Sequence, residues 1–120
     1  MEFQVEARTE GAVTVITITG ELDLYTAPRL EEALARASAG TPPRVVVDLA
    51  RTAYMDSTAL RVLTAALKRF RERGGELAIV VTQPPIAKLF TITGLDQVFP
   101  ICPTESEALA RARSGAPGQP

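Results

Sequence analysis

The sequence predicts one α/β domain, with a mixed sheet of about five strands and about four helices that lie mainly on one face of the sheet. Two observations lead to this fold class. Short runs rich in β-branched residues alternate with longer stretches in which apolar residues recur at helical spacing. The first two strand-like runs are separated by a short turn and indicate an antiparallel hairpin, whereas helices separate the later strands, which should therefore be parallel.

The predicted strands are short apolar runs bounded by turn residues. The strongest, residues 13–19, is dense in β-branched side chains. Ile16 and Ile18 lie on one of its faces. Val13 and Val15 lie on the other, which we expect to be an exposed sheet face; the sequence does not decide whether it mediates self-association. The following Gly-Glu-Leu-Asp segment is expected to be a loop, and the remaining strands are expected at 4–8, 44–49, 77–82 and 98–101.

The helices are predicted from apolar residues at helical spacing between capping and breaking residues. The longest covers residues 57–73, and Gly74 should end it in left-handed backbone. Its core face is expected to consist of Leu60, Leu63, Leu67 and Phe70, and its opposite, solvated face of Arg61, Lys68, Arg71 and Arg73. The other helices should begin near Thr26, Pro84 and Thr104 and end near Gly40, Gly94 and Arg113.

Composition excludes several classes of function. The chain has 13 Lys and Arg residues and 14 Asp and Glu residues, and its net charge of −1 argues against a nucleic-acid-binding protein that neutralises phosphates. Because the chain has no histidine, Ser-His-Asp or Cys-His catalysis and any His-containing metal site are impossible. It also lacks a phosphate-binding glycine loop. We therefore expect no enzymatic activity, no metal and no cofactor.

Domain organisation and location are inferred from the chain ends and the cysteine content. The domain should cover residues 1–113, and the Gly-, Pro- and Ser-rich residues 114–120 are expected to form a disordered tail. The acidic N-terminus does not resemble a signal peptide, and no apolar run approaches the ~20 residues of a membrane span. Cys102, the single cysteine, cannot form an internal disulfide, which agrees with a cytoplasmic location.

One polar stretch, residues 54–61, lies between a buried strand and the longest helix. Asp56, Ser57 and Thr58 can accept hydrogen bonds from the free N–H groups of a first helical turn, where the helix dipole favours negative charge. A hydroxyl at this position is well placed to carry a phosphate. If Ser57 is itself the cap, Ser57→Ala should cost ~1 kcal/mol of stability. Asp23 also follows a strand and precedes a helix, so we expect it at the same edge of the sheet.

Three motifs together resemble a known family. Gly-Glu-Leu-Asp at 20–23, Met-Asp-Ser-Thr at 55–58, and Lys-Leu-Phe at 88–90 followed by Gly94-Leu95 are similar, in order and spacing, to the bacterial anti-sigma-factor antagonists, which are single STAS domains. The resemblance extends from about residue 3 to residue 113. It implies a STAS-like form of the mixed sheet predicted above, in a protein with no catalysis of its own.

The resemblance also implies a partner and a switch. Members of the family bind an anti-sigma factor that is also a serine kinase, and this frees a sigma factor for transcription. The kinase phosphorylates the serine after the motif aspartate, here Ser57, which switches binding off until a phosphatase restores it. Asp56 matches the residue before that serine, Thr58 matches the second hydroxyl residue, and Asp23 matches the loop aspartate on the partner-binding edge.

The chain departs from the family pattern directly after the two hydroxyl residues. The family usually has Gly-Leu-Gly there, and this chain has Ala59-Leu60-Arg61. Ala59 adds a methyl group where glycine permits close backbone approach. Arg61 adds a cation within one turn of Ser57, where it can pair with a phosphate or alter which partner is accepted. Arg61 therefore joins Asp23, Asp56, Ser57 and Thr58 in the predicted partner-binding set.

Two other roles stay open at the level of sequence. A docking subunit of another assembly, such as a lipid-transport ATPase or a stress-signalling scaffold, would use the same helix edge without serine phosphorylation. Weak nucleotide binding is the second, since some STAS domains bind purine nucleotides. Incubation with ATP and candidate kinases separates the docking subunit from the antagonist, and calorimetric titration with nucleotides tests the second role.

Overall fold

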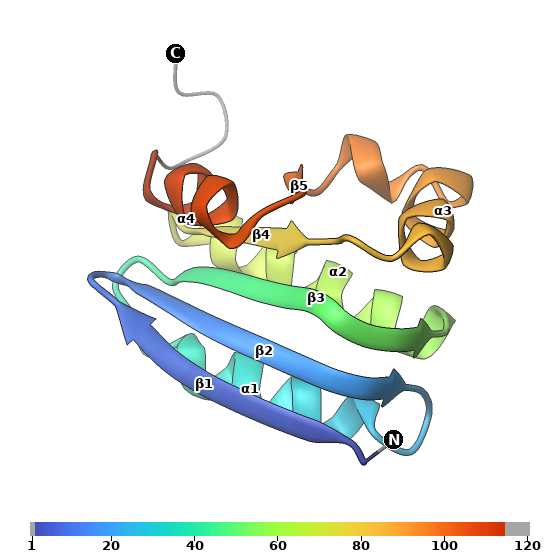
Figure 1. The fold of residues 1–120 in the computed structure, drawn as a ribbon. Helices are drawn as coiled ribbons and strands as arrows, with labels where there is room; N and C mark the ends of the chain where they lie inside the picture. Colours follow the sequence, from blue (N-terminus) through green and yellow to red (C-terminus); the bar gives the residue numbers. More distant parts are fainter. Residues whose placement is uncertain (1, 115–120) are drawn as a thin grey trace.

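The fold is a five-stranded mixed sheet in the order β1-β2-β3-β4-β5, shown in Figure 1 for a computed structural model that describes residues 2–114. The antiparallel pair comprises β1 (Gln4–Glu10) and β2 (Val13–Leu22), and the strands that continue the sheet in parallel are β3 (Arg44–Met55), β4 (Glu76–Val80) and β5 (Ile101–Cys102). The predicted hairpin and the predicted parallel strands are both confirmed.

Three helices bury their apolar residues against one face of the sheet, and the fourth lies on the other face. The first group comprises α1 (Ala27–Ala37), α2 (Ser57–Glu72) and α3 (Pro84–Ile92), and the fourth helix is α4 (Glu105–Ser114). Figure 1 shows α1 and α2 behind the sheet and α4 in front of it. The predicted core face of α2 is confirmed, because its four apolar side chains are at most 5% exposed.

The face of β2 that carries Val13 and Val15 is not exposed, contrary to the prediction. Both side chains are fully buried in a second core with residues of β3, β4 and α4. α4 contributes Ala108 and Ala112 to this core, and such small side chains allow a helix to pack close to the sheet. This face is therefore not available for self-association.

The ends of β2 and β3 extend further than predicted. The segment 20–22, predicted to be a loop, is the last part of β2, and β3 continues past Leu49 to Met55. The added strand residues include polar side chains, so the apolar pattern did not predict this extension. One of them, Thr52, is buried, and its hydroxyl donates to the Ile18 carbonyl oxygen at 3.0 Å. Irregular pairing near Gly20, whose φ of 106° suits glycine, lets the two strands stay together to their ends.

The C-terminal part differs from prediction in its boundaries. Of the strand predicted at 98–101, only Ile101 is in a strand, the two-residue β5, since Pro100 has no N–H group for a strand ladder; a short 3-10 helix, Leu95–Gln97, comes before this segment. Ser114, predicted to start the tail, is the last residue of α4, and the rest of the predicted tail lies outside the described residues. None of the helices between residues 2 and 114 has the length and hydrophobicity that a membrane span requires.

Candidate functional site

The predicted site lies at one end of the sheet, where β2 and β3 stop side by side. Leu22 and Met55 are paired residues of these two parallel strands, so Asp23 and Asp56 leave the sheet at the same edge. The Asp56 N–H group donates to the Leu22 carbonyl oxygen at 3.1 Å, which ties the start of α2 to the end of β2. The prediction that Asp23 and Ser57 lie at the same edge of the sheet is confirmed.

Asp56, and not Ser57, is the N-cap of α2. One Asp56 carboxylate oxygen accepts hydrogen bonds from the backbone N–H groups of Thr58, at 2.9 Å, and Ala59, at 3.4 Å. Ser57 is the first helical residue, and its side chain is exposed. Within residues 2–114 the Ser57 hydroxyl makes no hydrogen bond. The conditional assignment of Ser57 as the cap is therefore wrong, and the hydroxyl is left free to react.

Asp23 holds its own loop in place. One of its carboxylate oxygens accepts from the N–H groups of Tyr25, at 2.9 Å, and Thr26, at 3.1 Å. The Thr26 hydroxyl accepts from the Asp23 N–H group at 2.9 Å and donates to the Glu21 carbonyl oxygen at 2.7 Å. This network determines the path of the chain from β2 into α1, so the Asp23 carboxylate shapes the edge on which the predicted site lies.

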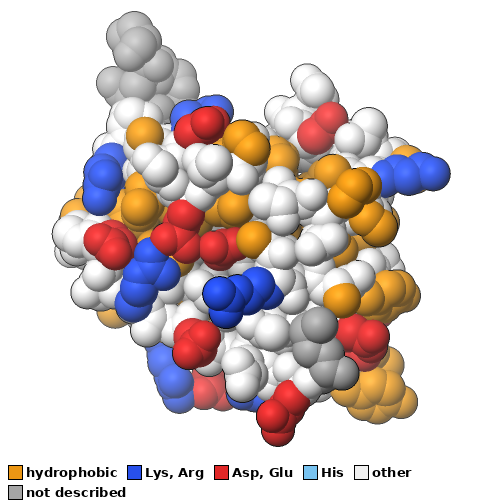
Figure 2. Space-filling model, in the orientation of Figure 1, with side chains coloured by type: hydrophobic (Ala, Val, Ile, Leu, Met, Phe, Trp, Pro, Cys, Tyr) orange, Lys and Arg blue, Asp and Glu red, His pale blue; other side chains and the backbone are white. Residues whose placement is uncertain are grey.

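The loop held by Asp23 displays two large apolar side chains that sequence reasoning missed. Leu24 is 63% exposed and Tyr25 is 86% exposed, and Tyr54 at the end of β3 is 52% exposed. In Figure 2 hydrophobic surface gathers at the right of the molecule, where Figure 1 places the loop between β2 and α1. The available signal was the presence of Leu and Tyr in a predicted loop, outside any strand or helix pattern.

A shallow groove runs from this loop between α1 and α2. It is lined by Leu24, Ala27, Pro28 and Glu31 on one side and by Thr58, Arg61, Val62 and Ala65 on the other. The structure therefore brings two predicted site residues, Thr58 and Arg61, together with the exposed Leu24. Within the described part of the chain, the Arg61 guanidinium forms no hydrogen bond or ion pair.

The site has no arrangement suited to a metal ion. Between residues 2 and 114, no group of three or more His, Cys, Asp or Glu side chains is placed to hold one. The polar groups that the site offers include the Ser57 and Thr58 hydroxyls, the Asp56 carboxylate, which already accepts hydrogen bonds from N–H groups, and the Arg61 guanidinium. Such a set can accept a modification or a partner.

Comparison with known proteins identifies the family. Residues 4–108 match the STAS domain family. The chain is 38% identical over 92 residues to an anti-sigma-B factor antagonist of Listeria monocytogenes, which covers 77% of this chain and 81% of that protein. The chain belongs to the anti-sigma-factor antagonist family of STAS domain proteins. An anti-sigma F factor antagonist of Paenibacillus polymyxa is 30% identical over 113 residues, which covers 91% of this STAS domain and 94% of that protein.

A solved structure shares the whole architecture of this STAS domain. The anti-sigma factor antagonist of Mycobacterium paratuberculosis superimposes with a TM-score of 0.84 at 31% identity, over 93% of this chain and 95% of that one. Residues 4–108, which match the STAS domain family, include both strand ends and the start of α2. The candidate site is part of the shared fold.

The three family motifs have different structural roles in this STAS domain. The first two form the edge that carries Asp23 and Ser57. The third is structural, because Phe90 is fully buried and packs edge-on against Phe99, with ring centroids 5.8 Å apart. Of the two departures from the family pattern, Ala59 points into the core and is fully buried. Arg61 alone changes the surface.

Proposed function

We propose that this STAS domain binds an anti-sigma factor that is also a serine kinase, thereby frees a sigma factor, and is switched off by phosphorylation of Ser57. The observation that carries the proposal is an exposed serine hydroxyl at the first position of α2, beside an exposed apolar loop, with no hydrogen-bond partner within residues 2–114. The names of the relatives, anti-sigma factor antagonists, support the partner class. A cytoplasmic location belongs to this proposal, as does a phosphatase that removes the phosphate.

The partner surface is the region where the β2–α1 loop meets the start of α2. Exposed apolar and aromatic side chains such as Leu24 and Tyr25 are the kind that anchor protein–protein contacts. The groove between α1 and α2 extends this surface past Thr58 and Arg61. A protein partner that covers both regions would also cover the start of α2, where the Ser57 side chain is exposed.

The switch is an effect of charge. Phosphorylation replaces a neutral hydroxyl with about −1.5 to −2 charges at pH 7. Within the domain, the dipole of α2 makes this charge tolerable. At an interface shaped for a hydroxyl, the same charge must be desolvated, which is costly unless it is paired, and Asp56 adds like charge next to it. No rearrangement of the sheet is required.

The direct test is phosphorylation with the cognate anti-sigma kinase and ATP, read by mass spectrometry and by a binding assay. We expect one phosphate on Ser57 and loss of detectable complex. Ser57→Ala should abolish phosphate incorporation and retain binding. Thr58→Val is the matched control, and it should still be phosphorylated on Ser57.

Two outcomes would redirect the assignment. Phosphate on Thr58 would move the modification by one residue. If no cognate kinase modifies the protein but a partner still binds, with affinity lost in Tyr25→Ala, the domain is a docking subunit of another assembly. Calorimetric titration with purine nucleotides tests the remaining alternative, nucleotide binding.

A further inference from the structure

A polar hollow of about 410 Å³ lies at the end of the domain opposite Ser57. It is lined by Arg71, Asp96, Gln97, Val98, Phe99, Pro100, Ile101 and Arg111. The hollow exists because β5 is short. β5 pairs only with Ile79 and Val80, so no described strand lies beside the first residues of β4 on this side. Since α2 rises 1.5 Å per residue, Arg71 is roughly 20 Å from Ser57 along the helix.

Arg71 is held in place at the rim of this hollow. Its Nε donates to Glu76 Oε1 at 3.0 Å and its Nη2 to Oε2 at 3.4 Å. Glu76 is only 6% exposed, and its Oε1 also accepts the Leu77 N–H group at 3.0 Å. The guanidinium is therefore oriented by a buried carboxylate, while its Nη1 has no hydrogen-bond partner within residues 2–114. A donor with its position already determined loses little entropy when it binds a ligand.

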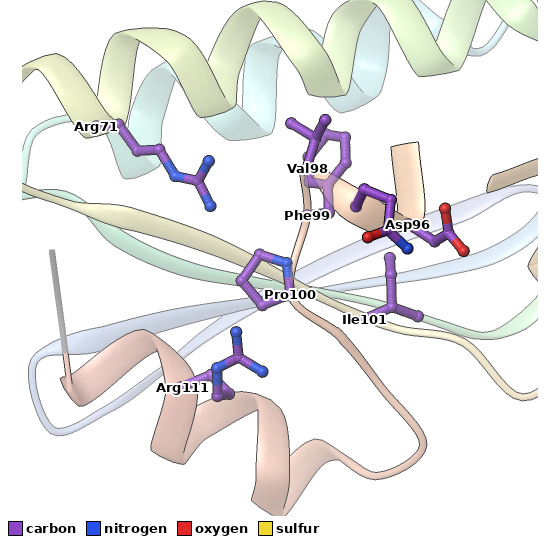
Figure 3. A pocket seen from close by; sticks show the side chains of 8 residues that line it. Arg71, Asp96, Val98, Phe99, Pro100, Ile101 and Arg111 are labelled. Atoms are coloured by element: carbon purple, nitrogen blue, oxygen red, sulfur yellow. The ribbon is translucent and has the colours of Figure 1, made fainter. Parts of the chain in front are cut away.

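Arg111 approaches the same space from α4. Its side chain makes no hydrogen bond or ion pair within the described residues, and it is exposed. Figure 3 shows the two guanidinium groups directed toward Pro100 from opposite sides. Asp96, the acidic residue of the lining, lies to one side, and its carboxylate points away from both arginines (Figure 3). The space between the arginines is therefore bordered by cationic donors.

We propose that this hollow binds the oxyanion group, phosphate or carboxylate, of a small molecule between Arg71 and Arg111. Guanidinium groups bind both oxyanions through pairs of charge-assisted hydrogen bonds. The volume of about 410 Å³ falls in the range of about 300–1,000 Å³ that is typical of small-molecule sites. The accessible lining of the hollow is mostly polar, which suits a small polar molecule. This site is separate from the proposed partner surface and does not depend on it.

The test follows the arginine Nε–Hε signals of the full chain by NMR while inorganic phosphate, malonate or sodium chloride is added at matched ionic strength. We expect saturable shifts of the Arg71 and Arg111 signals with phosphate, malonate or both, and no saturation with chloride. A response to phosphate alone identifies a phosphorylated ligand, and a response to malonate alone identifies a carboxylate.

Two variants of α4 decide whether the arginines form the site. Arg111→Gln should weaken anion binding by about tenfold or more, because it removes charge-assisted hydrogen bonds. Arg113→Gln is the matched control, since Arg113 is exposed on the same helix outside the hollow, and it should bind like the parent chain. Equal affinity of the two variants would overturn the proposal, as would shifts that chloride reproduces. Unchanged thermal unfolding of both variants excludes a folding defect as the cause.

Discussion

The two ends of α2 hold their polar side chains differently. At the N-terminal end, the Asp56 carboxylate accepts hydrogen bonds from helix N–H groups, and the neighbouring Ser57 hydroxyl is exposed and has no hydrogen-bond partner among the described residues. At the C-terminal end, the buried Glu76 carboxylate fixes the Arg71 guanidinium. One end thus presents an exposed hydroxyl group, and the other a guanidinium group that a buried carboxylate holds in place. The difference arises because Arg71 pairs with the buried Glu76 carboxylate, whereas the Ser57 hydroxyl has no such partner within residues 2–114.

The largest effect on stability is expected from a substitution in the core between the two ends of α2. Leu63 lies in the middle of α2 and is fully buried against the sheet. Leu63→Ala should lower the free energy of unfolding by about 2–5 kcal/mol, because it removes buried methyl groups and leaves a cavity. Denaturant unfolding followed by circular dichroism measures the change. A loss below 1 kcal/mol would mean that the helix is not held by this core.

The next largest effect on stability is expected at the C-terminal end of α2. Arg71→Ala should cost about 1–3 kcal/mol, because Glu76 then remains buried with only the Leu77 N–H group as its hydrogen-bond partner. The matched control is Arg69→Ala, an exposed residue of the same helix, which should change stability by less than about 0.5 kcal/mol. If the two variants unfold alike, Arg71 is not fixed in the way described.

At the N-terminal end, the cap is expected to matter more than the serine. Asp56→Ala should cost ~1 kcal/mol, since two N–H groups of the first turn lose their acceptor. Asp56→Asn should recover most of this loss, because the amide oxygen can accept the same hydrogen bonds. Urea unfolding of the three proteins tests this order, and equal stability of Asp56→Ala and the parent would contradict the cap assignment.

Asp48 differs from Asp56 and Glu76, because its hydrogen bond does not fully offset the cost of burying its charged form. It lies on β3, where desolvation by burial raises the pKa of its carboxyl above the ordinary 3.8, the Ala50 N–H group opposes this, and Glu105 raises the pKa further. The Glu105 pKa is lowered from 4.5, mainly by the hydrogen bond from Arg8. The two groups therefore affect stability in opposite directions as pH changes.

The sign of the pH effect follows from these shifts. A raised folded-state pKa means that Asp48 contributes stability below pH 3.8 and loses it as the pH rises through its folded value. The Asp48→Asn variant cannot ionise at this position and should not lose this stability. The free energy of unfolding of the variant, relative to that of the parent, should therefore rise between acid and neutral pH. The gain should be below about 1 kcal/mol, since the side chain is partly exposed. Unfolding curves across this pH range test it, and a relative fall toward neutral pH would contradict the shift.

The sequence predicted the fold and the location of the site better than the details of either. Polar residues before an apolar helical repeat place a helix start near Ser57, and two strand ends at one sheet edge follow from parallel topology. Asp, Ser and Thr all cap helices, so sequence could not show that Asp56 is the cap. Nor could it show the burial of Val13, which depends on α4 crossing the sheet, or the pairing of Arg71 with Glu76. These depend on tertiary contacts that no local pattern records.

The smallest effect on stability, and the one that separates modification from folding, is expected at Ser57. Because the hydroxyl has no hydrogen-bond partner within residues 2–114 and alanine favours helix, Ser57→Ala should change the free energy of unfolding by less than about 0.5 kcal/mol. This replaces the ~1 kcal/mol expected of a cap. The domain phosphorylated at Ser57 should unfold at the same denaturant concentration as the unmodified protein or at a higher one, because the helix N-terminus favours negative charge. Loss of partner binding without loss of stability would then place the switch at the interface. A phosphorylated domain that unfolds more easily would instead assign the switch to the fold.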